Sequence, residues 1–312
     1  MIFEISHRTS YRYATPVSQS HHLLHLTPRP HALQSVGRHS LLIDPAPAAK
    51  AEIIDDFGNP TSIIAIEQEH TELVIHARSM VEVRAPSRVD PKATSGWNDV
   101  AAQLRANLGS ETFEAVPYTC PSSFIRPSRE IYNFAKPSFP ENRPLLEAVL
   151  DLTARIFRDF TYDSTATEIA TPVGEVLQLR RGVCQDFAHL EIACLRTLGL
   201  AARYVSGYLL THPPEGQPKL VGSDASHAWI SVWMPEAGWV DFDPTNNIMP
   251  SVEHITLAFG RDYQDVSPVS GVLLGGGDHQ VDVAVDVNPV SPAITGSNGT
   301  ASPPSATLPP QR

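Results

Sequence analysis

The stretch that decides the fold runs from residue 180 to residue 199 and reads Arg-Arg-Gly-Val-Cys-Gln-Asp-Phe-Ala-His-Leu-Glu-Ile-Ala-Cys-Leu-Arg-Thr-Leu-Gly. Apolar residues recur in it at helical spacing, at Phe187, Leu190, Cys194 and Leu198. Gly199 then supplies a helix stop. The pattern predicts a helix over 184–198 that packs along this apolar stripe and begins at or near Cys184.

A cysteine at the start of a helix suits thiol chemistry. The free N–H groups of the first turn and the helix dipole stabilise an anion, which favours the thiolate over the thiol. The same N–H groups are able to bind an oxyanion. The common alternative is a small buried hydrophobe, and it describes Cys194 in mid-helix and fits Cys120. The helix pattern alone leaves both readings open for Cys184.

Two later segments supply partners for a thiol: Ser-His-Ala-Trp at 226–229 and Trp-Val-Asp-Phe-Asp-Pro-Thr at 239–245. Alternating apolar residues predict strands over 228–234 and 238–243, joined at a Pro-Glu-Ala-Gly turn into a hairpin. His227 and Trp229 fall on one face of the first strand. The alternative for His227 is a hydrogen-bonded histidine on a solvent-facing side of the sheet, with no role in chemistry.

The register of this hairpin tests whether an imidazole meets a carboxylate. Apolar residues on one shared face require paired residue numbers to have an even sum. A sum of 470 places His227 opposite Asp243, and a sum of 472 makes them diagonal neighbours. Parity leaves Asp241 open as well, because it lies on the same polar face. Asp243 precedes Pro244, which favours a strand end at a cleft rim, so Asp241 is the fallback orienting acid.

The remaining chain divides by composition. Short apolar segments with turn residues between them predict an N-terminal antiparallel β-sandwich over 1–85; they lie at 2–5, 39–43, 62–66 and 73–83. Residues 86–143 are rich in proline and predict a connector with short helices. Residues 144–288 are expected to form an α+β domain, including a helix over 144–158, a strand over 202–210 and an alternating run over 281–287. The tail, 289–312, has no apolar periodicity and is expected to be disordered.

Charge and cysteine content exclude several classes of protein. The 312 residues carry 23 Lys and Arg against 34 Asp and Glu, and no basic run, so we expect no nucleic-acid partner. No window is long and apolar enough for a membrane span. Three cysteines argue against a disulfide framework, and Glu4 and Arg8 interrupt the place of a signal-peptide core, so a cytoplasmic protein is expected. The oligomeric state stays open.

Neither a cofactor nor a metal is expected. His21, His22 and His25 form a cluster, but no cysteine or acidic residue stands at ligand spacing beside them. A metallohydrolase built on these histidines is therefore the weaker hypothesis. The glycines at 275–277 lack the Lys-Ser/Thr that follows a phosphate-binding loop.

Several motifs, taken together, resemble the bacterial transglutaminase-like family. The core motifs are Gly-Val-Cys-Gln-Asp-Phe-Ala-His, Leu-Arg-Thr-Leu-Gly-Leu-Ala-Ala-Arg-Tyr-Val-Ser-Gly-Tyr, Ser-His-Ala-Trp and Gly-Trp-Val-Asp-Phe-Asp-Pro-Thr-Asn. The segments Tyr11-Arg12-Tyr13, Pro16-Val17, Leu26-Thr27-Pro28-Arg29 and Asp56-Phe57-Gly58-Asn59 resemble the β-rich domain often attached to that core. Gly260-Arg261-Asp262-Tyr263 resembles the segment after the core. Only the proline-rich tail lies outside the resemblance.

The resemblance implies a papain-like core, with a helix-borne cysteine packed on an antiparallel sheet. It implies Cys184 as nucleophile, His227 as base and Asp243 as orienting acid, acting on protein or peptide amides through an acyl-enzyme that an amine or water releases. Gln185 is a candidate oxyanion donor and Trp229 a candidate cleft wall. A cysteine peptidase that only hydrolyses and an inactive peptide-binding scaffold are the alternatives.

Overall fold

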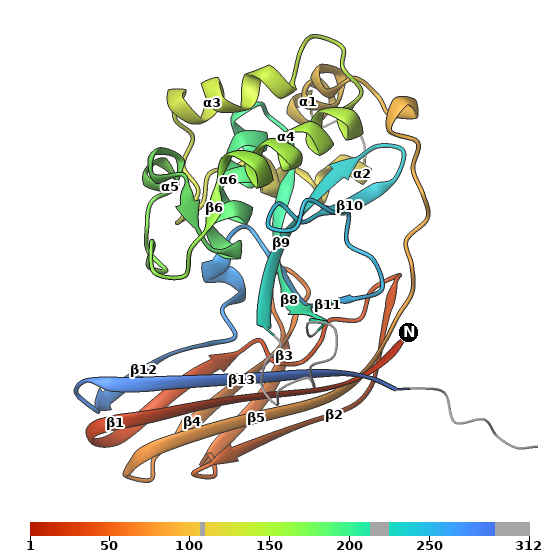
Figure 1. Cartoon of the computed structure of the whole chain (residues 1–312). Coiled ribbons are helices and arrows are strands. Elements are labelled where there is room, and N and C mark those ends of the chain that lie inside the picture. Colours follow the sequence, from red (N-terminus) through yellow and green to blue (C-terminus); the bar gives the residue numbers. More distant parts are fainter. Residues whose placement is uncertain (107–109, 213–224, 291–312) are drawn as a thin grey trace, which may run out of the picture.

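The structure is a computed structural model, and it describes residues 1–106, 110–212 and 225–290. Figure 1 shows two parts: a broad antiparallel sheet, and a core of helices and strands that stands on one face of it. The α+β class, with an antiparallel N-terminal part before a mixed core, is confirmed.

The N-terminal part is one seven-stranded sheet built around a long central strand, β1 (Ile2–Leu24). One side of β1 pairs with β5 (His70–Val83) and then β4 (Pro60–Ile66), and beyond these lie β2 (Gln34–Asp44) and β3 (Ala49–Ile54). The strands therefore form a single curved sheet and not the two packed sheets of a sandwich. The reason is the length of β1, which offers each of its halves a separate pair of neighbours.

The other side of β1 pairs with strands from the far end of the chain. These are β12 (Val269–Gly275) and β13 (His279–Val290), whose register runs from Tyr13 opposite His279 to Ile2 opposite Val290. The alternating run at 281–287 is a strand as predicted, but it belongs to the N-terminal sheet, and it continues past the predicted start of the tail. The rest of that tail lies outside the described residues.

The core is a four-stranded antiparallel sheet in the order β10-β9-β8-β11, covered by helices (Figure 1). Its strands are β8 (Ala202–Leu209), β9 (Ala225–Met234), β10 (Gly238–Phe242) and β11 (His254–Gly260). Helix α6 (Cys184–Thr197) packs against β8 and β9, and every residue from Asp186 to Arg196 is buried. It is thus enclosed between the sheet and the outer helices.

The outer helices include the predicted connector. They are α1 (Trp97–Ala106), α2 (Ser110–Phe113), α3 (Arg129–Ala135), α4 (Leu145–Asp159) and α5 (Val173–Leu179). Four 3₁₀ turns and a short parallel pair complete the described elements: η1 (Pro91–Ala93), η2 (Val116–Thr119), η3 (Lys136–Ser138), η4 (Tyr263–Val266), β6 (Thr161–Tyr162) and β7 (Arg181–Gly182). Val100 of α1 and Phe134 of α3 share one apolar cluster with Leu190 of α6. The connector segment therefore packs as part of the core.

Two amide side chains join the N-terminal part to the free edge of β11. The Gln34 amide donates to the carbonyl of Thr256 at 2.8 Å and accepts its N–H at 2.9 Å. The Asn59 amide makes the same pair of bonds with Phe259, also at 2.8 and 2.9 Å. Each amide satisfies a backbone edge as a neighbouring strand would, so the two parts are held in one fixed arrangement.

Among the described helices, none is both long enough and apolar enough to cross a bilayer.

Candidate active site

The start of α6 is fixed by a glycine and an aspartate. Asp186 accepts the Val183 N–H at 2.8 Å and the Thr167 hydroxyl at 2.6 Å. A Cβ at position 182 would lie 2.6 Å from an Asp186 carboxylate oxygen, so Gly182 leaves room for this contact. The result is a helix whose first residue is Cys184, with a half-buried, unpaired thiol. Cys194 is buried in the same helix and Cys120 is exposed.

His227 and Asp243 meet as the hairpin parity allows. Strands β9 and β10 pair with a residue sum of 472, for example Gly238 with Met234, which makes His227 and Asp243 diagonal neighbours. The imidazole Nε2 of His227 lies 2.7 Å from Oδ2 of Asp243. Both side chains are buried, so this contact is shielded from solvent.

Asp243 is surrounded by hydrogen-bond donors. Its Oδ1 accepts the backbone N–H groups of Thr245 and Asn246, at 2.9 and 3.2 Å. Its Oδ2 accepts the Asn246 amide at 2.7 Å, in addition to His227. Burial raises the pKa of this carboxyl, but its hydrogen bonds outweigh burial and hold the pKa well below its usual range. Asp243 is therefore a carboxylate at neutral pH.

The imidazole of His227 is held in its charged form. Burial lowers its pKa, yet the hydrogen bonds and charges of Asp243 and Cys184 raise it to about 10. At neutral pH the imidazole thus carries a proton between a carboxylate and the thiol. This is the arrangement that a thiolate–imidazolium pair requires.

The comparison of Asp241 with Asp243 separates the two acids that parity left open. The carboxylate of Asp241 accepts the indole N–H of Trp229 at 3.1 Å. Trp229 is fully buried behind His227, with their rings stacked 6.0 Å apart. Asp241 thus positions a ring that supports the imidazole, and Asp243 contacts the imidazole itself. Trp229 lies behind His227 and forms no wall of the cleft.

Known proteins resemble both the N-terminal sheet and the core of this chain. Residues 3–82 match the bacterial transglutaminase-like N-terminal region, and residues 133–244 match the transglutaminase-like superfamily. An uncharacterized protein of Mycobacterium tuberculosis is 42% identical over 295 residues, which cover 92% of each chain. The chain belongs to the bacterial transglutaminase-like family.

Two further matches are narrower in what they show. A protein-glutamine gamma-glutamyltransferase of Pseudomonas aeruginosa is 33% identical over 107 residues, 32% of this chain and 16% of that protein. A solved structure, that of a candidate cysteine protease from Cytophaga hutchinsonii, covers 95% of this chain and 92% of its own with a TM-score of 0.71. At 21% identity, the second match shows a shared fold.

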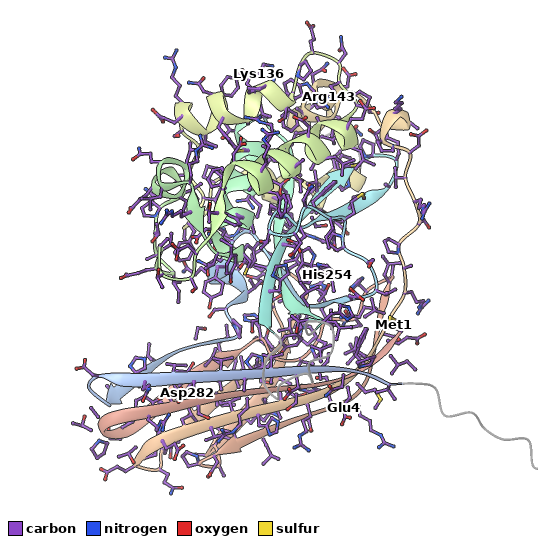
Figure 2. The ribbon with its side chains drawn as sticks, viewed as in Figure 1. Met1, Glu4, Lys136, Arg143, His254 and Asp282 are labelled. Carbon is purple, nitrogen blue, oxygen red and sulfur yellow. The ribbon has the colours of Figure 1, made fainter. Side chains whose placement is uncertain are left out.

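A second histidine contacts the aspartate of this transglutaminase-like core. Nε2 of His254 lies 3.2 Å from Oδ2 of Asp243, and its ring meets Trp229 edge-on at 5.2 Å. Figure 2 shows His254 at the end of the core that faces the N-terminal sheet. Sequence reasoning missed it, because one histidine at the start of an apolar strand carries no distinguishing signal. It also lies beyond the matched core region, which ends at residue 244.

Gln185 lies next to Cys184 and at the edge of the cleft, but its amide has another partner. The Nε2 group donates to the carbonyl of Ile169 at 3.0 Å. This bond ties the start of α6 to the segment before α5. Gln185 thus has a role in positioning that segment, and the first-turn backbone N–H groups are the other candidates for an oxyanion.

Two further ionisable residues of α6 face the interior. Burial lowers the pKa of His189 to about 4, and its Nε2 accepts the Tyr263 N–H at 3.1 Å. Burial raises the pKa of Glu191 to about 8, so at neutral pH this group is mostly protonated, and it accepts the Thr153 hydroxyl at 2.6 Å. Both hold neighbouring elements against α6 and lie outside the cleft.

The cleft of this family member is a cavity of about 970 Å³ between its core and its N-terminal sheet. Cys184 and His227 line it on the core side, together with Tyr204 and Ser206. This volume lies at the upper end of the range of roughly 300–1,000 Å³ for small-molecule pockets, so it exceeds what a single side chain fills.

One group of side chains has the spacing of metal ligands. Ligand atoms of His227, Asp243 and His254 lie within 4.8 Å of one another. The same atoms are joined by hydrogen bonds in which the imidazoles donate to the carboxylate, and a metal would have to displace those protons. His22 lines the cleft, and His25 contacts the Ser267 carbonyl and Asp55. The histidines at 21–25 thus have separate surroundings.

Proposed function

We propose that this protein is a cysteine enzyme that acts on protein or peptide amides through a Cys184 acyl-enzyme. The observation that carries the proposal is a helix-start thiol and a protonated imidazole that line one cavity, with a buried carboxylate in contact with the imidazole. A structural cysteine requires no base or orienting acid, whereas a nucleophilic cysteine requires a base to activate the thiol and a third group to orient that base. The match to a protein-glutamine gamma-glutamyltransferase supports amide carbonyls as the reacting group.

The proposed reaction has two halves. The Cys184 thiolate attacks the amide carbon, and N–H groups at the start of α6 bind the oxyanion that forms. His227 gives its proton to the leaving nitrogen, the C–N bond breaks, and a thioester remains. An amine or water then attacks the thioester, His227 takes the proton from the attacking group, and the C–S bond breaks. Asp243 holds the imidazole in the required orientation throughout.

The test uses dimethylated casein as acyl donor and a biotin-labelled primary amine as acceptor. Wild type should attach the amine to casein, and Cys184→Ala should not. Cys120→Ala is the matched control, because Cys120 is also a free cysteine with an accessible side chain. We expect that control to retain wild-type activity.

The alternatives give different products. New peptide N-termini without amine attachment would replace transfer with a peptidase that only hydrolyses. Equal activity in wild type and Cys184→Ala would contradict a Cys184 acyl-enzyme altogether. An unreactive Cys184 that alkylates with iodoacetamide only at strongly alkaline pH would favour the inactive peptide-binding scaffold.

A further inference from the structure

The wall that faces Cys184 comes from the N-terminal sheet. Side chains of β1, β12 and β13 line the cavity opposite the core, and those of β1 and β13 alternate along the strands: His7, Thr9, Tyr11, Tyr13, Val281 and Val283. The wall is thus one face of a sheet, assembled from the two ends of the chain. In the matched core alone, this side of the thiol would be open.

This wall is fixed relative to the thiol. The His7 imidazole lies 2.8 Å from the hydroxyl of Tyr208 on β8, the strand that pairs with β9 beside His227. Gln34 and Asn59 attach the same N-terminal part to β11. A rigid wall can select a substrate at little ordering cost, because its side chains are already in place.

Strand alternation separates charged from uncharged residues on this sheet. The cavity is lined by 26 described residues, and none is Asp, Glu, Lys or Arg, although such residues make up 18% of the chain. The intervening residues of the same strands include Glu4, Arg12 and Asp282, of which the last two form an ion pair on the outer face. Apart from the Cys184–His227 pair, the described lining is therefore uncharged because of where the strands place their charged residues, and not because the chain lacks such residues.

Two histidines of the wall, His7 and His22, have pKa values below the ordinary value of 6.5. Burial and the nearby His76 lower the pKa of His7 to about 4, and burial also lowers the pKa of His22. Tyr11 and Tyr13 stack in parallel with their ring centres 6.2 Å apart. The wall thus presents aromatic surface with neutral hydrogen-bonding groups, which suits peptide planes and uncharged side chains.

We propose that the N-terminal sheet is the acyl-donor subsite, and that it selects an uncharged peptide segment around the reacting amide. This inference rests on the proposed function, since it names the substrate of the same thiol. A charged side chain that packs on this wall would lose water without gaining an Asp, Glu, Lys or Arg partner among the described lining residues. Both signs of charge should therefore be rejected, although the net charge of −11 would by itself favour a basic peptide.

The experiment measures recognition without turnover. Three peptides carry a chloroacetamide on a side chain of glutamine length, flanked by Ala, Ser and Phe, by two Lys, or by two Asp. The Cys184 thiolate displaces chloride and forms a thioether, and intact mass gives the rate. The full chain with Cys120→Ala serves as background, which removes the exposed thiol.

We expect the neutral peptide to react at least tenfold faster than either charged peptide. Val283→Asp places a carboxylate on the cavity face, and it should raise the rate with the Lys peptide several-fold and lower the rate with the Asp peptide. Ala284→Asp is the matched control, because Ala284 is the next residue of β13 and faces the other side. It should leave the ratios of the three rates unchanged.

The outcomes separate this inference from the proposed function. Equal rates for the three peptides, or equal effects of Val283→Asp and Ala284→Asp, would overturn the uncharged subsite while Cys184 still reacts. A faster Lys peptide in the background chain would show that overall charge, and not the cleft, selects the substrate, and would also overturn it. Failure of iodoacetamide to label Cys184 at neutral pH would instead overturn the proposed function.

Discussion

The core sheet and the N-terminal sheet differ in how far along the chain their strands find partners. In the core, β8, β9 and β10 follow one another and pair in that order, so His227 and Asp243 meet across a single hairpin. In the N-terminal sheet, Ile2 pairs with Val290. The residues proposed for chemistry are therefore placed by local sequence, whereas the wall of the cleft is placed by pairing between the chain ends.

The largest expected effect tests the local half of this comparison. Asp243→Asn should lower kcat/KM by about 10²–10⁴-fold, because an amide cannot stabilise the imidazolium of His227 as a carboxylate does. Asp241→Asn should cost less than about tenfold, since the Asp241 carboxylate accepts the Trp229 indole N–H, whereas Asp243 contacts the imidazole of His227 directly. Steady-state kinetics of both variants on one glutamine peptide provides the measurement. Similar losses in the two variants would mean that direct contact with His227 does not decide which aspartate is the orienting acid.

The pH dependence tests the same contact in the wild type. Asp243 and Cys184 raise the pKa of His227 to about 10, so the imidazolium persists far above the ordinary value of 6.5. The imidazolium that we propose as the acid for the leaving nitrogen is present below this pKa and is lost above it. Beyond about pH 10, kcat/KM should fall tenfold per pH unit. An alkaline limb centred near pH 6.5 would show that His227 is not held in its charged form.

These local predictions also show how far sequence reasoning reached. The helix at 184–198 and the strands at 228–234 and 238–243 are confirmed. They could be predicted because the helix and the hairpin form their hydrogen bonds between residues that lie close together in the sequence. Parity required an even residue sum for the hairpin, and the observed sum of 472 is one of the two registers that were expected to bring His227 near Asp243. The same parity could not separate Asp241 from Asp243, since it fixes a face and not a distance.

The N-terminal sheet could be predicted only in pieces. Its short apolar segments are strands, yet a sandwich was expected, because no local signal shows that β1 continues for 23 residues through Pro16. Nor does the alternating run at 281–287 show which strand it joins. His254 was missed for a related reason: its contact with Asp243 depends on β11 pairing with β8, which the residue pattern does not reveal.

His254, in the core sheet, is expected to act as a positioning residue for Asp243. It donates to Asp243 but does not line the cavity, so its loss should act on the carboxylate and not on substrate binding. His254→Leu should lower kcat about tenfold with KM nearly unchanged. His254→Gln, which restores an N–H donor, should recover most of the activity. A loss that appears mainly in KM, or equal losses in the two variants, would leave His254 with a packing role only.

The smallest expected effect on activity concerns the long-range half of the comparison. Gln34→Ala would leave the Thr256 N–H of β11 without a partner, and Asn59→Ala would leave both the N–H and the C=O of Phe259 without one, which costs about 1–3 kcal/mol per unsatisfied group. The melting temperature of the full chain should fall by several degrees, while Gln280→Ala, which removes an exposed amide on β13, should not change it.

Activity should change less than stability in these two variants. Because the contacts among Cys184, His227 and Asp243 lie within the core, kcat on a small glutamine dipeptide should stay within about threefold of wild type. A longer peptide that reaches the N-terminal sheet should lose more, through KM. If both substrates lost activity equally, the fixed wall would serve stability and not substrate selection.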